Sequence, residues 1–279
     1  MTFPSGADET CRNLVSIRPS FIVKNLQASM DHYVERFGFQ RDFSGPEGGP
    51  FWGQVSRDEA AIIFKAVGPD VPPVPNHTRH EWARWDAYIY TVDPDALFVE
   101  FRERGVSFWK ELSFIDDGLW GFEVTDADGY VVAFFRSHDD HRSASETSSN
   151  LESVSPFFIV KDLQASIDFY IERFGFQRDF TGPEGGAFYG QVSRDGIAIF
   201  LKKIGRDVLP VPHHTRHEWG PWDAYIYTLD PDALFAEFRQ RGVSFRKELG
   251  FLEPGLWGFE VRDADGYSLA FFRLRNGGG

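Results

Sequence analysis

The sequence predicts an α+β protein made of two tandem copies of one small module, each copy containing two βαβββ units. The first observation is an internal repeat: residues 19–136 align with residues 156–273 at a constant offset of 137, and 88 of the 118 aligned positions are identical. The second is size, because about 118 residues is the length of one compact domain. The third is the order of strand-like and helix-like segments, which reads βαβββ twice in each copy.

The first βαβββ unit of each copy is predicted from β-rich segments around one amphipathic helix. A strand over residues 19–24 precedes Asn25, a residue type that commonly caps helix N-termini, and Asp162 takes this place in the second copy. Apolar residues then recur at helical spacing until Gly38, where the helix is expected to end. Three strands are predicted to follow, at residues 39–43, 51–56 and 60–65.

The second unit of each copy follows a long loop over residues 67–84 that contains several prolines. Asp93 followed by Pro94 predicts the start of a helix that ends before Gly105. The motif Asp126-Ala-Asp-Gly129 predicts a hairpin turn between two strands. Strands are predicted here at residues 86–92, 106–112, 119–125 and 130–136.

The repeat divides the chain into two modules, at residues 16–136 and 155–274. Residues 137–154 are polar and rich in serine, so a flexible linker is expected between the modules. Residues 276–279 are expected to form a disordered tail. Because homodimers commonly form about a twofold axis, the two modules are expected to pair as a pseudo-dimer within one chain, which would act as a monomer, or with another chain as a dimer.

The composition excludes several classes of partner. A net charge of −13 does not suit nucleic acid, whose phosphates require a basic surface, but it would attract cationic small molecules. Cys11 is the one cysteine, so no internal disulfide can form and a reducing cytoplasm is expected. Residues 1–13 contain no apolar segment of the kind found in signal peptides. No apolar run reaches 18 residues, so no membrane partner is expected.

Two motifs, present in both copies, carry a family resemblance. F-I-V-K-N-L-Q-A-S-M-D-H-Y-V-E-R-F-G-F at residues 21–39 combines a strand, a capped helix and a glycine stop, and D-A-D-G-Y-V-V-A-F at residues 126–134 is a hairpin. With these motifs the chain resembles the vicinal oxygen chelate superfamily, and most closely its glyoxalase/bleomycin-resistance branch. The resemblance covers both copies almost completely and implies the fold of that branch.

The resemblance also implies where metal-dependent members hold a divalent ion, at three strand positions of each module. These positions are filled here by Arg18, Asp86 and Ala133 in the first copy and by Ser155, Asp223 and Ala270 in the second. A divalent site needs about three N, O or S ligands, whereas alanine has none, arginine is a fixed cation and a serine hydroxyl is a weak ligand. We therefore expect neither a catalytic metal at this place nor a cofactor.

A second source of metal ligands lies just before the aspartate position. His77, His80 and Glu81 cluster there, and His214, His217 and Glu218 repeat the cluster in the second copy. The segment follows V-P-P-V-P, so a loop is predicted rather than a metal-binding helix. The histidines are expected mainly to anchor this loop by hydrogen bonds, while ligand contact and metal binding stay open. No serine lies on a G-x-S-x-G elbow, so no catalytic residue is assigned.

Aromatic and acidic side chains predict a small-molecule site on a concave face of the sheet. If Asp86 points into this face, strand alternation places Tyr88 and Tyr90 there too, while Ala87 and Ile89 face the helices. The parity of the tryptophans is not fixed by the sequence, and a core position for the aromatic residues is the alternative. The predicted ligand-binding residues are Trp52, His80, Trp82, Trp85, Asp86, Tyr88, Tyr90, Trp109, Trp120, Phe135, Tyr189, His217, Trp219, Trp222, Asp223, Tyr225, Tyr227, Trp257 and Phe272.

Three functions are compatible with these observations. The first is a metal-free binding protein of the bleomycin-resistance type, which sequesters a cationic, aromatic antibiotic or metabolite through stacking and cation–π contacts. The second is an enzyme, either a glyoxalase-like lyase or isomerase or an extradiol-type dioxygenase, in which the histidine clusters replace the lost ligands. The third is a scaffold or ligand sensor. Lys24, Lys161, Arg57 and Arg194 are expected to be solvated and without a role in binding.

Overall fold

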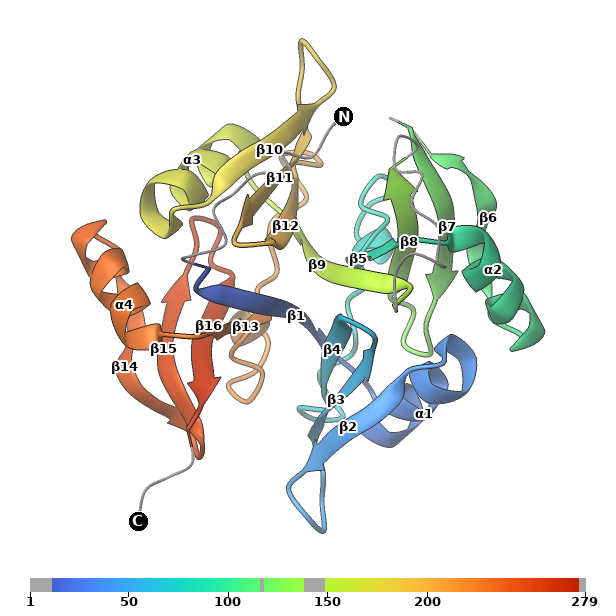
Figure 1. Ribbon diagram of the computed structural model, residues 1–279, viewed down its shortest axis with the longest axis horizontal. Coiled ribbons are helices and arrows are strands. Elements are labelled where there is room, and N and C mark those ends of the chain that lie inside the picture. The colour runs from blue at the N-terminus through green and yellow to red at the C-terminus, as the bar shows by residue number, and fades with distance from the viewer. Residues whose placement is uncertain (1–11, 116–117, 138–148, 276–279) are drawn as a thin grey trace. The chain divides into compact units, whose positions relative to one another are not determined.

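The computed structural model describes residues 12–115, 118–137 and 149–275, and these form two compact units (Figure 1). Among them, the first unit comprises residues 19–155 and the second comprises residues 12–18 and 156–275. Each unit contains two βαβββ segments, as the sequence predicted. The pairing of the two modules as a pseudo-dimer stays a prediction.

The first unit contains two helices, each packed against the strands of its own segment. Its strands hydrogen-bond in the orders β1-β4-β3-β2 and β9-β5-β8-β7-β6, with β1–β4 and β5–β8 parallel. Its elements are part of β1 (Leu14–Ile22), α1 (Leu26–Phe37), β2 (Gln40–Gly45), β3 (Trp52–Arg57), β4 (Ala60–Lys65), the short 3-10 turn η1 (Asn76–Thr78), β5 (Ala87–Thr91), α2 (Pro94–Glu103), β6 (Phe108–Ile115), β7 (Leu119–Thr125), β8 (Val131–Ser137) and part of β9 (Leu151–Ile159).

The second unit repeats this arrangement. Its strands pair in the orders β9-β12-β11-β10 and β1-β13-β16-β15-β14. Besides the remaining parts of β1 and β9, its elements are α3 (Leu163–Phe174), β10 (Gln177–Gly182), β11 (Tyr189–Arg194), β12 (Ile197–Lys202), η2 (His213–Thr215), β13 (Ala224–Thr228), α4 (Pro231–Gln240), β14 (Phe245–Glu253), β15 (Leu256–Arg262) and β16 (Ser268–Leu274).

The helices begin and end where the sequence predicted. The Asn25 side chain accepts a hydrogen bond from the Ala28 amide at 3.0 Å, and Gly38 ends α1 in the left-handed region with φ 70°. Asp93 caps α2 by accepting from the Ala96 amide at 2.9 Å. Local capping chemistry therefore marks where α1 and α2 begin and where α1 ends.

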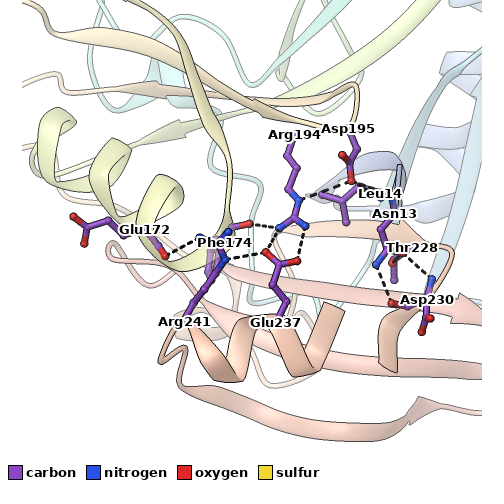
Figure 2. Close-up of polar contacts among 10 residues, drawn as sticks. All are labelled: Asn13, Leu14, Glu172, Phe174, Arg194, Asp195, Thr228, Asp230, Glu237 and Arg241. Atoms are coloured by element: carbon purple, nitrogen blue, oxygen red, sulfur yellow. Dashed lines mark hydrogen bonds and ion pairs between the residues drawn. The ribbon is translucent and has the colours of Figure 1, made fainter. Parts of the chain in front are cut away.

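The first strand of each repeat is divided between the two units. In the second unit, the Asn13 carbonyl oxygen accepts from the Leu229 amide at 2.8 Å. The Asp195 carboxylate accepts from the Asn13 and Leu14 amides, each at 3.0 Å (Figure 2). Asn13 Oδ1 also accepts from the Thr228 hydroxyl at 2.6 Å. These contacts hold the start of β1 within the second unit.

The equivalent contacts of the first unit involve the end of the predicted linker. Asp58 accepts from the Asn150 and Leu151 amides at 3.0 and 2.9 Å, and the Asn150 side chain accepts from the Thr91 hydroxyl at 2.7 Å. Strand β9 thus starts at Leu151, and Ser137 ends β8, so ordered strands extend into both ends of the predicted linker 137–154. The middle of that linker and the predicted tail 276–279 lie outside the described residues.

Aromatic side chains from the helices and the sheets form the core of each unit. In the first unit, the ring of Phe37 on α1 stacks on Phe101 of α2 at a centroid distance of 5.4 Å, and Phe122 stacks on Phe134 at 5.4 Å. All four side chains are buried. Burying an aromatic side chain of this size stabilises the fold by about 1.5–3 kcal/mol relative to leaving it exposed.

A pair of arginines joins the helices of the second unit to each other (Figure 2). Arg194 makes a bidentate ion pair with Glu237 on α4, at 3.0 and 2.7 Å, and donates to the Phe174 carbonyl at the end of α3. Arg241 holds the other side of the Glu237 carboxylate at 2.8 Å. Arg57 pairs with Glu100 in the same way. The expectation that Arg57 and Arg194 are solvated was therefore wrong, because helix-borne carboxylates draw both of them inward.

None of the described helices combines the length and the apolar composition that crossing a bilayer requires.

Candidate functional site

The strands of the second βαβββ segment in each unit have one side covered by a helix and one side without a helix. In the first unit, Ala87, Ile89 and Phe134 belong to the same core cluster as Phe101 of α2. Alternation puts Tyr88 and its parallel-strand neighbour Ala133 on the opposite side. We call this opposite side the helix-free face; in the second unit it carries Tyr225, Ala270 and Glu260. The predicted parity of β5 is confirmed.

The long loop between β4 and β5 packs on the helix-free face of the first unit. The Trp85 ring lies 5.2 Å from the ring of Phe135, and Phe135 in turn lies 5.8 Å from Tyr88. His77 lies 4.7 Å from the ring of Trp109 on β6. The loop thereby brings together aromatic residues that are distant in the sequence.

Asp86 fastens this loop to the sheet. One carboxylate oxygen accepts from the Asn76 amide in η1 and the other from the Val131 amide at the start of β8, both at 2.8 Å. Asp223 does the same in the second unit, accepting from the His213 amide at 2.9 Å and the Ser268 amide at 2.8 Å. Each of these aspartates therefore positions the loop above the face through two buried hydrogen bonds.

Burial raises the pKa of Asp86 and Asp223, and also of two further buried aspartates, Asp126 and Asp263. The pKa of Asp86 is raised well above its usual value, that of Asp223 to about 8, and those of Asp126 and Asp263 to about 7; in each case burial outweighs the backbone hydrogen bonds that lower it. The pKa of each of these groups is higher in the folded protein than in the unfolded chain, where it is near 3.9. At pH values between the two pKa values, the folded state therefore binds more protons than the unfolded state.

We therefore expect the stability of the protein to fall as the pH rises from about 5 to about 8.5. Stability from these carboxyls is fully present below pH 4 and is lost as the pH passes through their folded-state pKa values. Urea denaturation midpoints at several pH values measure the effect. High salt should preserve the trend, because salt screens surface repulsion more than buried groups. Rising stability over this pH range would contradict the assignment.

The donor set at the positions of the superfamily's metal site does not fit a divalent ion. Both oxygens of Asp86 and Asp223 already accept backbone N–H groups, and the flanking positions hold alanine, arginine and serine. Within the described parts of the chain, no group of three or more His, Cys, Asp or Glu side chains is placed to hold a metal. Three such ligands are the usual minimum.

The histidine clusters are part of the loop's own structure. Nδ1 of His80 accepts from the Trp82 amide at 3.1 Å, and His217 makes the same bond with Trp219. Burial lowers the pKa of His77, and the pKa of His214 is lowered by burial and by the nearby charges of Arg262 and Arg246. The segment forms a single 3-10 turn in each unit, as expected for a loop rather than a metal-binding helix.

The two tryptophans of each loop differ in exposure. Trp82 and Trp219 are 60% and 57% exposed, at the outer surface of the loop. Trp222 is fully buried, with its ring edge-on to Tyr225 at 5.0 Å. The structure thus places Trp85 and Trp222 against the sheet, while Trp82 and Trp219 point to solvent.

Trp120 and Trp257 lie on the helix-covered side, which corrects their assignment to the ligand face. The indole N–H of Trp120 donates to Asp95 of α2 at 2.9 Å, and that of Trp257 donates to Asp232 of α4 at 2.9 Å. Strand alternation explains this, because each of them lies two residues before a core phenylalanine of the same strand.

Trp52 and Tyr189 lie in the other βαβββ segment of their units. Trp52 alternates along β3 with Gly53, whose Cα faces Met30 of α1, so the indole is on the side away from that helix. Its ring packs edge-on against Phe43 at 4.9 Å. Tyr189 packs against Phe188 at 5.3 Å.

The remaining predicted residues of the second unit gather on its helix-free face. Tyr225 and Tyr227 of β13 lie 6.2 and 4.6 Å from Phe272 of β16, and the guanidinium carbon of Arg18, in the middle of β1, lies 4.2 Å from the ring centroid of Tyr227. Tyr90 has the same place as Tyr227 in the first unit. Trp109 is replaced by Arg246, so the edge of the face changes from aromatic to cationic between the units.

Two buried carboxylates on the helix-free faces are absent from the predicted set. Glu123 of β7 lies opposite Ala133 and is fully buried, and Glu260 of β15 lies opposite Ala270 and is 2% exposed. The sequence held a signal for them, because each glutamate stands between two core residues in the strand motif W-G-F-E-V. Alternation with Phe122 and Val124 places Glu123 on the face of Ala133.

Comparisons with known proteins agree with this architecture. Residues 15–134 and 154–271 match the family model of the Glyoxalase/Bleomycin resistance protein/Dioxygenase superfamily. Glyoxalase I from Zea mays is similar in structure, with a TM-score of 0.60, 14% identity and 92% of each chain covered. A putative dioxygenase from Bacillus subtilis has a TM-score of 0.62 and 13% identity over 94% of this chain and 86% of its own.

At these identities the two solved structures support the fold alone, and the search of curated proteins gave no match. The family model, in contrast, spans both repeats and most of the chain. The capped helix, the hairpin and the βαβββ order on which the resemblance rested are all present in the structure. The chain belongs to the Glyoxalase/Bleomycin resistance protein/Dioxygenase superfamily.

Proposed function

We propose that this protein binds a cationic, aromatic small molecule without a metal ion, as a sequestering protein of the bleomycin-resistance type. The observation that supports this most is the helix-free face, where a buried carboxylate lies among tryptophan, tyrosine and phenylalanine rings under a loop fastened by an aspartate. Aromatic faces attract cations and stack on flat ligands, and a carboxylate supplies the opposite charge. The net charge of −13 favours the approach of a cationic ligand.

The second candidate is an enzyme of the same superfamily, a lyase, an isomerase or a dioxygenase. It is favoured by the fold similarity to a glyoxalase I and to a putative dioxygenase. Against it stands the donor set, because the aspartates at the expected metal positions already accept two backbone hydrogen bonds each. The two candidates differ in one measurable property: the enzyme would hold a divalent ion tightly, and the sequestering protein would not.

Elemental analysis of the purified protein separates the two candidates. We expect Zn, Ni, Mn and Fe at well below one ion per chain, including after incubation with each metal and removal of the excess. The reason is that, among the residues that the structure describes, no three His, Cys, Asp or Glu side chains lie together as a tight site requires. One or two firmly held ions per chain would favour the enzyme and would contradict sequestration.

Ligand binding itself is measured by tryptophan fluorescence. Titration with a bleomycin-type glycopeptide is expected to quench the emission, because a ligand bound at the helix-free face changes the surroundings of the indole packed there. Trp222→Phe should weaken the quenching. Trp257→Phe is the matched control, since this indole lies on the helix-covered side and bonds to Asp232. Equal quenching in both variants, or none with a broad panel of cationic aromatic ligands, would count against the proposal.

A further inference from the structure

The two units differ at one loop position that faces the buried glutamate. Arg84 directly precedes Trp85 in the first unit, and the equivalent position in the second unit is Pro221, directly before Trp222. The surrounding loop is otherwise alike, since Ala83 and Gly220 both donate an amide hydrogen bond to the carbonyl of the preceding histidine, at 2.9 and 3.2 Å. The difference therefore removes a guanidinium while this hydrogen bond of the loop is kept.

In the first unit, Arg84 supplies a cation to the buried carboxylate. Its Nη2 lies 2.8 Å from Oε1 of Glu123, which is fully buried. The same guanidinium lies 5.5 Å from the centroid of the Trp85 ring. A planar cation thus lies between a carboxylate and an indole, in the geometry that favours an arginine over a lysine.

In the second unit, the same carboxylate has lost this partner. Glu260 is 2% exposed, and proline carries no charge to meet it. Across residues 12–115, 118–137 and 149–275, no hydrogen bond or ion pair to the Glu260 carboxylate is found. A buried carboxylate without a partner is costly, because its lost hydration is not replaced.

Three cations of the second unit lie near this face, but none pairs with Glu260 in the described structure. Lys247 stands opposite Glu260 in the β14–β15 pair. Its ammonium group lies over the Trp222 ring, with the nitrogen 5.8 Å from the ring centroid. Arg262 follows two residues later on the same face of β15, and both Arg262 and Arg246 are close enough to His214 to lower its pKa. These side chains border the site and leave the glutamate itself unpaired.

We propose that the second unit binds the planar cationic group of the ligand, an amidinium or a guanidinium, between Glu260 and the Trp222 ring. The ligand takes the place that the Arg84 guanidinium takes in the first unit. The first unit is therefore closed to such ligands by its own arginine, and of the two equivalent places in the described structure only that of the second unit takes the cation. This inference rests on the proposed function and adds the unit, the charge partner and the shape of the ligand's cation.

Benzamidine is a suitable probe, because it joins a planar amidinium to a flat ring, and benzamide is its neutral counterpart. Calorimetry and ligand-detected NMR are expected to show binding of benzamidine and at least tenfold weaker binding of benzamide. Glu260→Gln should weaken benzamidine binding by about 10- to 100-fold, as expected for the loss of a hydrogen bond to a charged group. Lys247→Met should strengthen it by removing the cation over the Trp222 ring.

The first unit provides matched controls. Glu123→Gln makes the same change there and should leave benzamidine binding as in the parent protein, with folding checked by circular dichroism. Pro221→Arg should abolish binding by supplying the guanidinium within the chain. Arg84→Pro should add a second binding event if the variant folds; if it does not, the other variants decide.

Three outcomes would overturn the inference: no binding of benzamidine, equal binding of benzamide, or equal losses in Glu260→Gln and Glu123→Gln. The glycopeptide titration on the same variants keeps the proposed function separate. Quenching that persists unchanged in Glu260→Gln would leave ligand sequestration standing and would reject only the cation site. Absence of quenching in the parent protein would count against sequestration itself.

Discussion

Replacing Gly258 by alanine is expected to destabilise the second unit by about 3 kcal/mol or more. A Cβ at this position would overlap the carbonyl oxygen of Phe271 and would stand 2.7 Å from both Cα and Cβ of Phe272. These atoms belong to the neighbouring central strand, so they cannot move away without breaking the pairing of β15 with β16. Only glycine lets the two backbones approach this closely.

Urea denaturation followed by circular dichroism measures this effect as a lowered midpoint. Gly250→Ala is the matched control, because Gly250 lies on β14 of the same sheet and the atom nearest to the new Cβ, the Glu248 carbonyl oxygen, is 3.9 Å away. That variant should change the midpoint little. Similar midpoints for the two variants would show that the close approach at Gly258 does not exist.

Replacing Asp223 by alanine is expected to cost about 2–5 kcal/mol and to release the loop from the face. The change leaves the buried amides of His213 and Ser268 without their acceptors, at bonds that are 2.9 and 2.8 Å long in the parent protein. Asp223→Asn should be milder, because the amide keeps one carbonyl oxygen as an acceptor. Ligand binding should weaken in both variants, since the loop carries Trp222.

Hydrogen exchange of the His213 and Ser268 amides reports the release directly, alongside the denaturation midpoint. Both amides should lose protection in Asp223→Ala. Asp207→Ala changes an exposed aspartate of the same loop and serves as the control, with unchanged protection expected. If protection at His213 and Ser268 survived the loss of Asp223, the aspartate would not be what holds the loop, and a direct role in ligand binding would return.

The two buried glutamates show how far strand alternation leads and where it ends. Alternation along β5 correctly separated Tyr88 from Ala87 and Ile89, because successive side chains of a strand point to opposite faces. The same rule applied to β7 puts the side chains of Glu123 and Phe122 on opposite faces of the sheet. Whether that glutamate meets a cation depends on Arg84, 39 positions earlier in the chain, and no local pattern connects the two.

The tryptophans show the same limit. Trp85 and Trp120 are both tryptophans of the second βαβββ segment, yet one packs on the helix-free face and the other bonds to Asp95 of α2. The sequence repeat also did not predict that β1 and β9 are divided between the units. That division depends on the hydrogen bonds that Asp58 and Asp195 accept from backbone amides far away in the sequence.

By itself the sequence determined the duplication, the βαβββ order, the helix caps at Asn25 and Asp93, and the family, because each of these follows from chemistry within a few neighbouring residues or from comparison of the two copies. Tertiary structure alone decided that Asp86 and Asp223 fasten loops, that Trp120 faces a helix, and that Glu123 has an arginine where Glu260 has none. These depend on the register between strands and on the path of a long loop, both of which are fixed by packing between residues far apart in the chain.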